Sequence, residues 1–290
     1  MIYIGMNPDL ISTSNFVLTW HGIWTFIAVT LGIFLVGRWA PRYKIDPDTV
    51  YSAAIWCIVG GVIGARLVHV IDLWAFYSLN PWQIVAMWNG GIGIWGVPIG
   101  GFVGGALYAR HAKISLGHLA DLAAPGVILA MTVGRIGDII NGEHVGTLTT
   151  KPWGIVYTHP SSLSFQLYGD LTSHSPIAYE MIWNLVVFSI LWWLLKDRIR
   201  PHGMLYVAFL ALYAFGRFFT SFYRATDTDR LWAIGLNEGQ IICLLVLAVT
   251  VPLLAYRGYF VSREEALDES LAPKSRRKRA SDMRQKPPRA

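Results

Sequence analysis

Charged residues are scarce in this chain of 290 residues. Asp, Glu, Lys and Arg together make up 14% of it, whereas apolar residues make up 54% and the mean hydropathy is +0.43. A soluble domain of ordinary composition carries about 25% charged residues to keep its surface in water. The shortage therefore excludes an ordinary soluble protein and indicates that most of the chain lies in lipid.

Cysteine is nearly absent, and so are the motifs of metal and nucleotide sites. The two cysteines, Cys57 and Cys243, lie in apolar runs where a thiol behaves as a small apolar group, so we expect no disulfide. No pair of histidines or cysteines has the spacing of metal ligands, and neither a GxGxxG motif nor a nucleophile elbow occurs. We expect no metal, no nucleotide and no other cofactor.

The chain contains several long runs of apolar residues. A helix needs about 20 apolar residues to cross a hydrocarbon core of ~30 Å. Seven stretches meet this requirement and predict an all-α membrane protein of seven transmembrane helices, near residues 16–37, 50–71, 88–109, 118–140, 177–195, 204–222 and 238–256.

The basic residues predict the orientation, because Lys and Arg next to spanning segments stay on the cytoplasmic side. One set of connections, together with the carboxyl-terminal tail, holds 18 of the 24 basic residues. The opposite set holds only Lys151, Arg224 and Arg230. We expect the amino terminus outside and the carboxyl terminus in the cytoplasm.

Two segments outside the helices have a distinct composition. Residues 141–176 form the longest outside connection, and their turn formers and strand-prone residues favour short strands or a lid. Residues 257–290 form a basic tail that we expect to be largely disordered and attracted to anionic lipid rather than to nucleic acid. The rest, residues 1–256, is predicted to be one transmembrane domain.

Glycines recur in the third predicted span, where Gly96, Gly100 and Gly104 are four residues apart. Such spacing lets a second helix backbone approach closely in lipid, and packing is the simplest explanation. Pro98 within this run predicts a kink or a polar cavity beside the helix.

Three arginines, Arg66, Arg135 and Arg217, lie within or at the end of predicted spans. A charge at membrane depth is costly, so such a residue normally faces the protein interior and marks an ion pair or a substrate path. Arg66 has Asp72 nearby, which favours a structural ion pair. Arg135 has Asp138 three residues later on the same helix face, so an internal salt bridge is the alternative to a binding role.

Arg217 lies at an equivalent depth, with Tyr213 one turn before it and Ser221 one turn after it. Two unmatched guanidinium groups near one leaflet suit a phosphate, because the planar fork of arginine binds phosphate oxygens in a bidentate manner. Snorkelling toward lipid headgroups is the alternative.

His21, inside the first predicted helix, is the best-placed group for accepting a proton near neutral pH. A lone histidine in a helix bundle is more often a hydrogen-bonded interior residue, and both interpretations stay open.

Several motifs together resemble the prolipoprotein diacylglyceryl transferase family. They occur in order from about His21 to Leu245, and GRIG followed by NGE is the most specific: WHG, GARLVHV, WNGGIGIWG, DLAAPG, GRIGDIINGE, PWG, SPIAYE, FGRFFTSFYR and GLNEGQI. The resemblance implies a multi-pass enzyme of the bacterial plasma (inner) membrane. It implies transfer of a diacylglyceryl group from phosphatidylglycerol to the cysteine thiol of a prolipoprotein lipobox, with release of glycerol phosphate.

The resemblance also assigns roles to residues. Arg135 would bind the phosphate of phosphatidylglycerol, and Arg217 would assist the leaving group or control entry. The candidate catalytic residues are Arg135, Arg217, Glu143 and His21. The candidate substrate-binding residues are Arg135, Asp138, Asn141, Gly142, Gly146, Tyr213 and Trp95. The expected partners are phosphatidylglycerol, prolipoprotein signal peptides and the surrounding membrane lipids.

Four positions depart from the usual family pattern. The family usually has Asn at Asp138, Tyr at His21 and Glu at Ser221, and some members have His at Trp95. Asp138 would partly neutralise the charge of Arg135, and Ser221 removes a likely partner of Arg217. These departures raise an alternative, a catalytically impaired relative that binds anionic lipid or a preprotein. A lipid transporter of unrelated mechanism is a third hypothesis.

Overall fold

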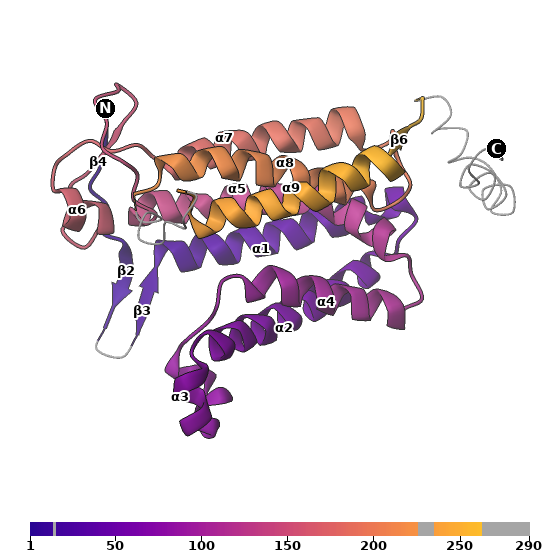
Figure 1. The fold of residues 1–290 in the computed structure, drawn as a ribbon, viewed down its shortest axis with the longest axis horizontal. Coiled ribbons are helices and arrows are strands. Elements are labelled where there is room, and N and C mark those ends of the chain that lie inside the picture. Colours follow the sequence, from indigo (N-terminus) through magenta and orange to yellow (C-terminus); the bar gives the residue numbers. More distant parts are fainter. Residues whose placement is uncertain (14–15, 226–234, 263–290) are drawn as a thin grey trace, which may run out of the picture.

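Long helices run side by side in a computed structural model of the chain, which describes residues 1–13, 16–225 and 235–262 (Figure 1). The helices are α1 (Trp20–Trp39), α2 (Pro47–Asp72), α3 (Trp74–Leu79), α4 (Gly96–His111), α5 (Leu116–Asn141), α6 (Leu163–Tyr168), α7 (Pro176–Ser189), α8 (Met204–Thr220) and α9 (Glu238–Arg257). The short strands are β1 (Ile2–Ile4), β2 (Asp9–Ser12), β3 (Val17–Thr19), β4 (Ile155–Tyr157), β5 (Ile199–Arg200) and β6 (Tyr259–Phe260).

Six helical segments of the described residues are long and apolar enough to cross a membrane. Three of them are α2, α5 and α9, and the other three include a short continuation at the end of the helix. Those three are α1 extended to Tyr43, α7 extended through a π-helical turn to Leu195, and α8 extended to Tyr223. The predicted class of all-α membrane protein is confirmed, and six of the seven predicted spans overlap these helices.

The third predicted span, residues 88–109, is shorter as a helix than predicted. α4 begins at Gly96 and has 16 residues, because Gly90 and Gly91 adopt positive φ angles of 78° and 87° that interrupt a helix. Pro98 therefore lies in the first turn of α4, where its missing N–H breaks no helical hydrogen bond. The predicted kink at Pro98 is wrong for that reason.

Arg66 stabilises the segment before α4 instead of pairing with Asp72. Its guanidinium donates hydrogen bonds to five backbone carbonyl groups, those of Gln83, Ile84, Ala86, Gly90 and Gly91. Since both the charge and the carbonyl groups are satisfied in this way, Arg66 is a structural residue, and the predicted ion pair with Asp72 is wrong.

α2 and α4 pack through glycines, as the four-residue spacing predicts. A Cβ at Gly100 would overlap the carbonyl of Gly60, and a Cβ at Gly96 would overlap the carbonyl of Gly64. The two backbones are therefore in direct contact along this stripe.

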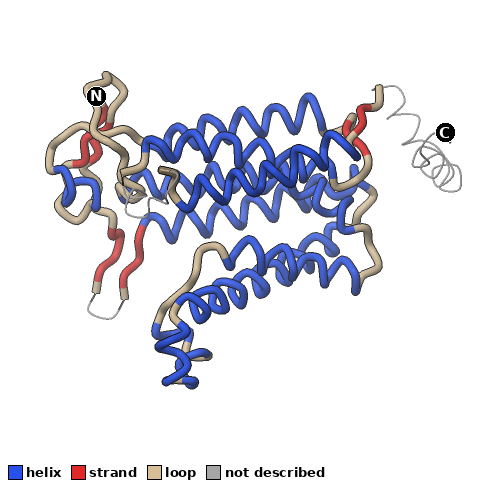
Figure 2. Tube along the Cα trace, viewed as in Figure 1, coloured by secondary structure: helices blue, strands red, loops and turns tan. Residues whose placement is uncertain are grey.

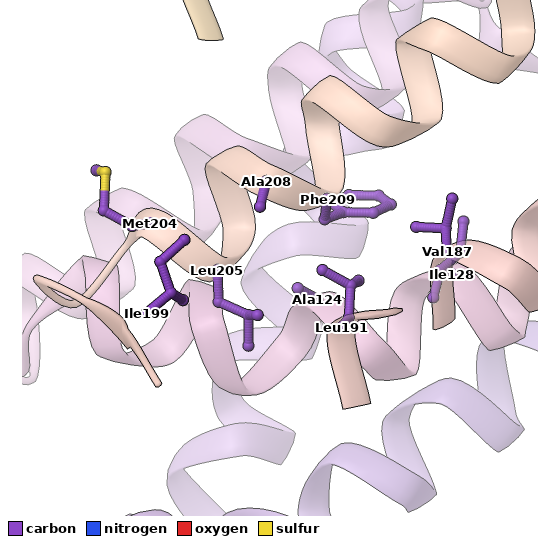
Figure 3. Packing of buried hydrophobic residues seen from close by; sticks show 9 residues of the cluster. All are labelled: Ala124, Ile128, Val187, Leu191, Ile199, Met204, Leu205, Ala208 and Phe209. Atoms are coloured by element: carbon purple, nitrogen blue, oxygen red, sulfur yellow. The ribbon is translucent and has the colours of Figure 1, made fainter. Parts of the chain in front are cut away.

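Apolar side chains fill the space between the other helices. One core cluster joins α5, α7 and α8, and Figure 3 shows its nine buried residues, which are Ala124, Ile128, Val187, Leu191, Ile199, Met204, Leu205, Ala208 and Phe209. A second cluster joins α1, α2, α4 and α5 through residues such as Val36, Ala53 and Leu122. These clusters pack the helices of the bundle against one another.

The strands lie beyond the two ends of the helices (Figure 2). At one end β1 pairs in parallel with β4, which belongs to the predicted outside connection, and β2 pairs with β3. At the opposite end β5 pairs with β6. Residues 141–176 thus contain one short strand, β4, and isolated β-bridges, whereas Arg230 and residues 263–290 of the predicted tail lie outside the described residues.

Candidate active site

Four helix ends meet at the same end of the bundle as β4 (Figure 1). α1 and α7 begin here, with Thr19 and Ser175 accepting hydrogen bonds from backbone N–H groups of the first turn. α5 and α8 end here. The helix ends bring together polar residues that are far apart in the sequence.

Glu180, near the start of α7, lies at the centre of the site. Its side chain is 2% exposed, and its Oε2 lies 2.8 Å from the Arg135 guanidinium. Its Oε1 accepts hydrogen bonds from Arg217 at 2.6 Å and from Arg224 at 2.8 Å. The prediction of two unmatched guanidinium groups is therefore wrong, because one buried carboxylate pairs with both predicted arginines and with a third.

The three arginines differ in how far a ligand can reach them. The side chains of Arg135 and Arg217 are 18% and 17% exposed, whereas that of Arg224 is 2% exposed. A guanidinium carries five N–H donors, so an arginine that already pairs with carboxylates can also contact an added anion where its side chain is exposed. Arg135 and Arg217 are the two arginines that such an anion can contact.

Asp138 joins Arg135 to His21. One carboxylate oxygen accepts a hydrogen bond from Arg135 at 2.8 Å, and the other lies 2.6 Å from Nδ1 of His21. The salt bridge predicted as an alternative for Arg135 is therefore present. Gly137 permits the contact with α1, because a Cβ there would lie only 2.7 Å from Cα of His21.

The residues that follow α5 form the rim of the site. Gly142 ends the helix with a positive φ angle of 66°, and its carbonyl accepts a hydrogen bond from the Ser164 hydroxyl at 2.9 Å. Asn141 donates to Glu143 at 2.8 Å, and the other oxygen of Glu143 lies 3.8 Å from Nδ1 of His21. Glu143 and His21 are thus neighbours at a partly exposed position.

Gly146 and His144 connect this rim to the residues after α8. Gly146 forms a β-bridge with Arg224, and a side chain there would overlap the carbonyl of His174. Burial, together with the positive charges of Arg224 and Arg135, lowers the pKa of His144 to about 4. His144 is therefore neutral near pH 7.

Tyr213 and Trp95 occupy different positions relative to the cluster. Tyr213, on α8, has Glu180, Arg135 and Arg217 as charged neighbours. Trp95 precedes the first residue of α4 and is 38% exposed. Within the described part of the chain, Trp95 takes part in none of the ion pairs of the cluster.

His21, Asp138 and Glu143 have metal-binding side chains whose ligand atoms lie within 4.8 Å of one another. Both oxygens of Asp138 already contact a hydrogen-bond donor, His21 or Arg135. The hydrogen bond accounts for the close approach of His21 and Asp138, whereas Glu143 is held by Asn141 and lies 3.8 Å from His21.

The chain is similar to known proteins over most of its length. The sequence profile described as prolipoprotein diacylglyceryl transferase matches residues 8–256. This chain belongs to the prolipoprotein diacylglyceryl transferase family. The family assignment made from the motifs is thereby confirmed.

Curated relatives of the family carry the name phosphatidylglycerol--prolipoprotein diacylglyceryl transferase. A Dehalococcoides mccartyi protein is 34% identical over 258 residues, which cover 89% of this chain and 96% of the relative. A Listeria innocua protein is 31% identical over 274 residues, covering 94% and 98%. A Nostoc sp. protein is 31% identical over 265 residues, covering 88% and 90%.

Two of the positions expected to depart from the family pattern, His21 and Asp138, contact each other. The 2.6 Å separation between Nδ1 and Oδ1 shows that they form one hydrogen-bonded pair. Asp138 therefore has two partners, His21 and Arg135, and its charge is shared between them.

Ser221, a third departure, leaves Arg217 paired. Glu180 supplies the carboxylate, and the Ser221 hydroxyl donates to the backbone carbonyl of Arg217 at 2.9 Å. Ser221 supplies no carboxylate, as expected, but Arg217 keeps a carboxylate partner because Glu180 of α7 pairs with it. The impaired-relative hypothesis depended on this loss and on Asp138, and no feature of the site favours it.

Sequence reasoning missed Glu180 and Arg224 as site residues. Glu180 stands out as an acidic residue inside a predicted apolar span, in the motif SPIAYE, so the cost of a buried charge was a usable signal. Arg224 gave no such signal, because it follows the predicted end of a span and counts as an ordinary loop arginine.

Proposed function

We propose that this chain transfers the diacylglyceryl group of phosphatidylglycerol to the thiol of a lipobox cysteine in a prolipoprotein. The thiolate sulfur forms a bond to the terminal glycerol carbon of the diacylglyceryl group. The bond from that carbon to the phosphate oxygen breaks, and glycerol phosphate leaves with the electron pair. Membership of the family and the names of its curated relatives support this proposal.

The observation that carries the proposal is the pair of partly exposed arginines around Glu180. Arg135 and Arg217 come from different helices and reach the same buried carboxylate. In this proposal the phosphate of the lipid binds at the exposed parts of the two guanidinium groups, and both arginines stabilise the charge that builds on the leaving oxygen. Asn141, Gly142, Glu143, Gly146 and Tyr213 form the walls around the headgroup, and Trp95 contacts the lipid farther out.

Entry of the lipid from the outer leaflet agrees with a seven-crossing topology, in which the end of the bundle that carries the site faces outside. In this arrangement α4 is the additional span, third in chain order; at a rise of about 1.5 Å per residue its 16 residues cover ~24 Å of the ~30 Å core, and residues before Gly96 complete the crossing. The distribution of basic residues places the amino terminus and residues 141–176 outside and the tail in the cytoplasm. Residues 1–256 then form one transferase domain in a bacterial inner membrane, with membrane lipids around it.

Mass spectrometry of a lipobox peptide tests the proposal. The purified full chain, incubated with phosphatidylglycerol and the peptide, should add the mass of a diacylglyceryl group to the cysteine. Arg135→Ala should lower the rate about 10²-fold or more, because a charge-stabilising donor is lost. Arg110→Ala is the matched control, since Arg110 is exposed at the far end of α4. An unmodified peptide, under conditions in which a family member works, would contradict the proposal.

A further inference from the structure

The contact between His21 and Asp138 fixes which ring nitrogen carries a proton in the neutral imidazole. Nδ1 of His21 lies 2.6 Å from Oδ1 of Asp138. A carboxylate can only accept, so Nδ1 carries the hydrogen and Nε2 keeps a free lone pair. An imidazole in this state can take a proton from a neighbouring acid through Nε2.

The side chains of His21 and Asp138 differ in how much of each is exposed. The His21 side chain is 46% exposed, whereas that of Asp138 is 4% exposed. A substrate group can therefore reach His21 but not Asp138. His144, the other histidine near Asp138, is less suited to the role because its pKa of about 4 makes it a weak base.

The backbone holds His21 in this position. His21 lies in the first turn of α1, which Thr19 caps. Gly137, the residue before Asp138 on α5, has no side chain. The backbone at His21 can therefore lie directly against α5 at this point. The pair is thus fixed by helix packing rather than by a loop.

We propose that His21 is the base that removes the proton from the lipobox cysteine, and that Asp138 is its positioning residue. The inference rests on the proposed transfer. The thiol proton moves to Nε2 of His21, and the resulting thiolate attacks the glycerol carbon as the bond to the phosphate oxygen breaks. The imidazolium is stabilised by Asp138 and returns its proton to water or to the released phosphate.

The same carboxylate connects the base to the proposed phosphate site. The second oxygen of Asp138 accepts a hydrogen bond from Arg135 at 2.8 Å. Because Asp138 contacts both residues, it fixes the distance between the group that activates the thiol and the group that binds the phosphate. An acidic residue at this position therefore has a function beyond neutralising Arg135.

The dependence of the transfer rate on pH tests the assignment. His21→Gln should lower the rate at pH 7 by about 10² to 10⁴-fold without changing binding to phosphatidylglycerol vesicles. Its rate should then rise with pH as the thiol ionises by itself, up to a pH of about 8.5. The charged residues around His21 are Asp138 and Arg135 on α5 and Glu143 after it. The variant keeps all three, so a change in its pH profile is due to the loss of the imidazole.

A second variant and a rescue complete the test. Asp138→Asn should lower the rate about 10-fold or more at pH 7, and added imidazole should restore part of the rate of His21→Ala. If His21→Gln keeps the wild-type rate, or loses the same factor at every pH, the inference is wrong. Should the His21 variants not fold, the pH profile of Asp138→Asn decides in the same way. Absence of transfer by the wild-type chain would instead contradict the proposed function.

Discussion

At the scale of single residues, the site is controlled by one buried acid among three arginines. Glu180 is 2% exposed and contacts Arg135, Arg217 and Arg224. An unpaired charge in such a place would be costly, so the acid and the arginines depend on each other. Glu180 therefore positions the arginines and moderates their charge.

Glu180→Gln should destabilise the protein by about 3–5 kcal/mol, because it removes the buried carboxylate charge that pairs with three guanidinium groups. Thermal unfolding of the purified protein would measure the change as a lower midpoint. Asp72→Asn is the control, since Asp72 is exposed at the end of α2. Equal midpoints for both variants would show that the charge of Glu180 is not needed.

Some of these contacts could be predicted from the sequence, and others could not. The pair of Arg135 and Asp138 follows from their spacing, because residues three apart lie on one helix face. The contacts of Glu180 with Arg217 and of His21 with Asp138 join different helices. Their existence depends on how the helices pack, which no local spacing specifies.

At the scale of elements, glycine determines how α2 and α4 associate. Gly60 and Gly64 on α2 contact Gly96 and Gly100 on α4. Between lipid-embedded helices there is no hydrophobic drive, so close backbone packing has to supply the stabilisation. The periodic pattern in the sequence predicts this role, although it does not identify α2 as the partner.

Gly100→Ala should destabilise the pair by about 1–3 kcal/mol, because the new methyl group overlaps the α2 backbone at Gly60. Gly101→Ala is a matched control on the next residue, where a Cβ would make only an ordinary contact of 3.4 Å with the Cys57 carbonyl. Thermal unfolding of both variants in the same detergent measures the difference. A Gly100→Ala protein as stable as Gly101→Ala would show that α2 and α4 are loosely packed.

At the scale of the whole molecule, α4 distinguishes a topology of seven crossings from one of six. Asn89 precedes α4 and Lys113 follows it, and both are exposed. If α4 crosses the bilayer, these two residues lie on opposite sides of the membrane.

Cysteine labelling in intact cells would measure this topology. In a chain whose Cys57 and Cys243 are replaced by alanine, Asn89→Cys should react with a membrane-impermeant maleimide, and Lys113→Cys should react only after the membrane is opened. Lys151→Cys is the outside control, because it lies in the connection of residues 141–176. Reaction of both Asn89→Cys and Lys113→Cys from outside would show that α4 does not cross.

The sequence by itself determined the membrane class, the approximate helix positions and the family, because long apolar runs and ordered motifs are local properties of the chain. It also singled out Arg135, Arg217 and His21, since charged or titratable groups in apolar segments are rare. Only the tertiary structure decided their partners on other helices. Glu180 pairs with arginines from α5 and α8, Asp138 joins His21 to Arg135, and Arg66 binds backbone carbonyl groups. The physical reason is that an ion pair or a hydrogen bond forms between side chains that helix packing brings together, whatever their separation along the chain.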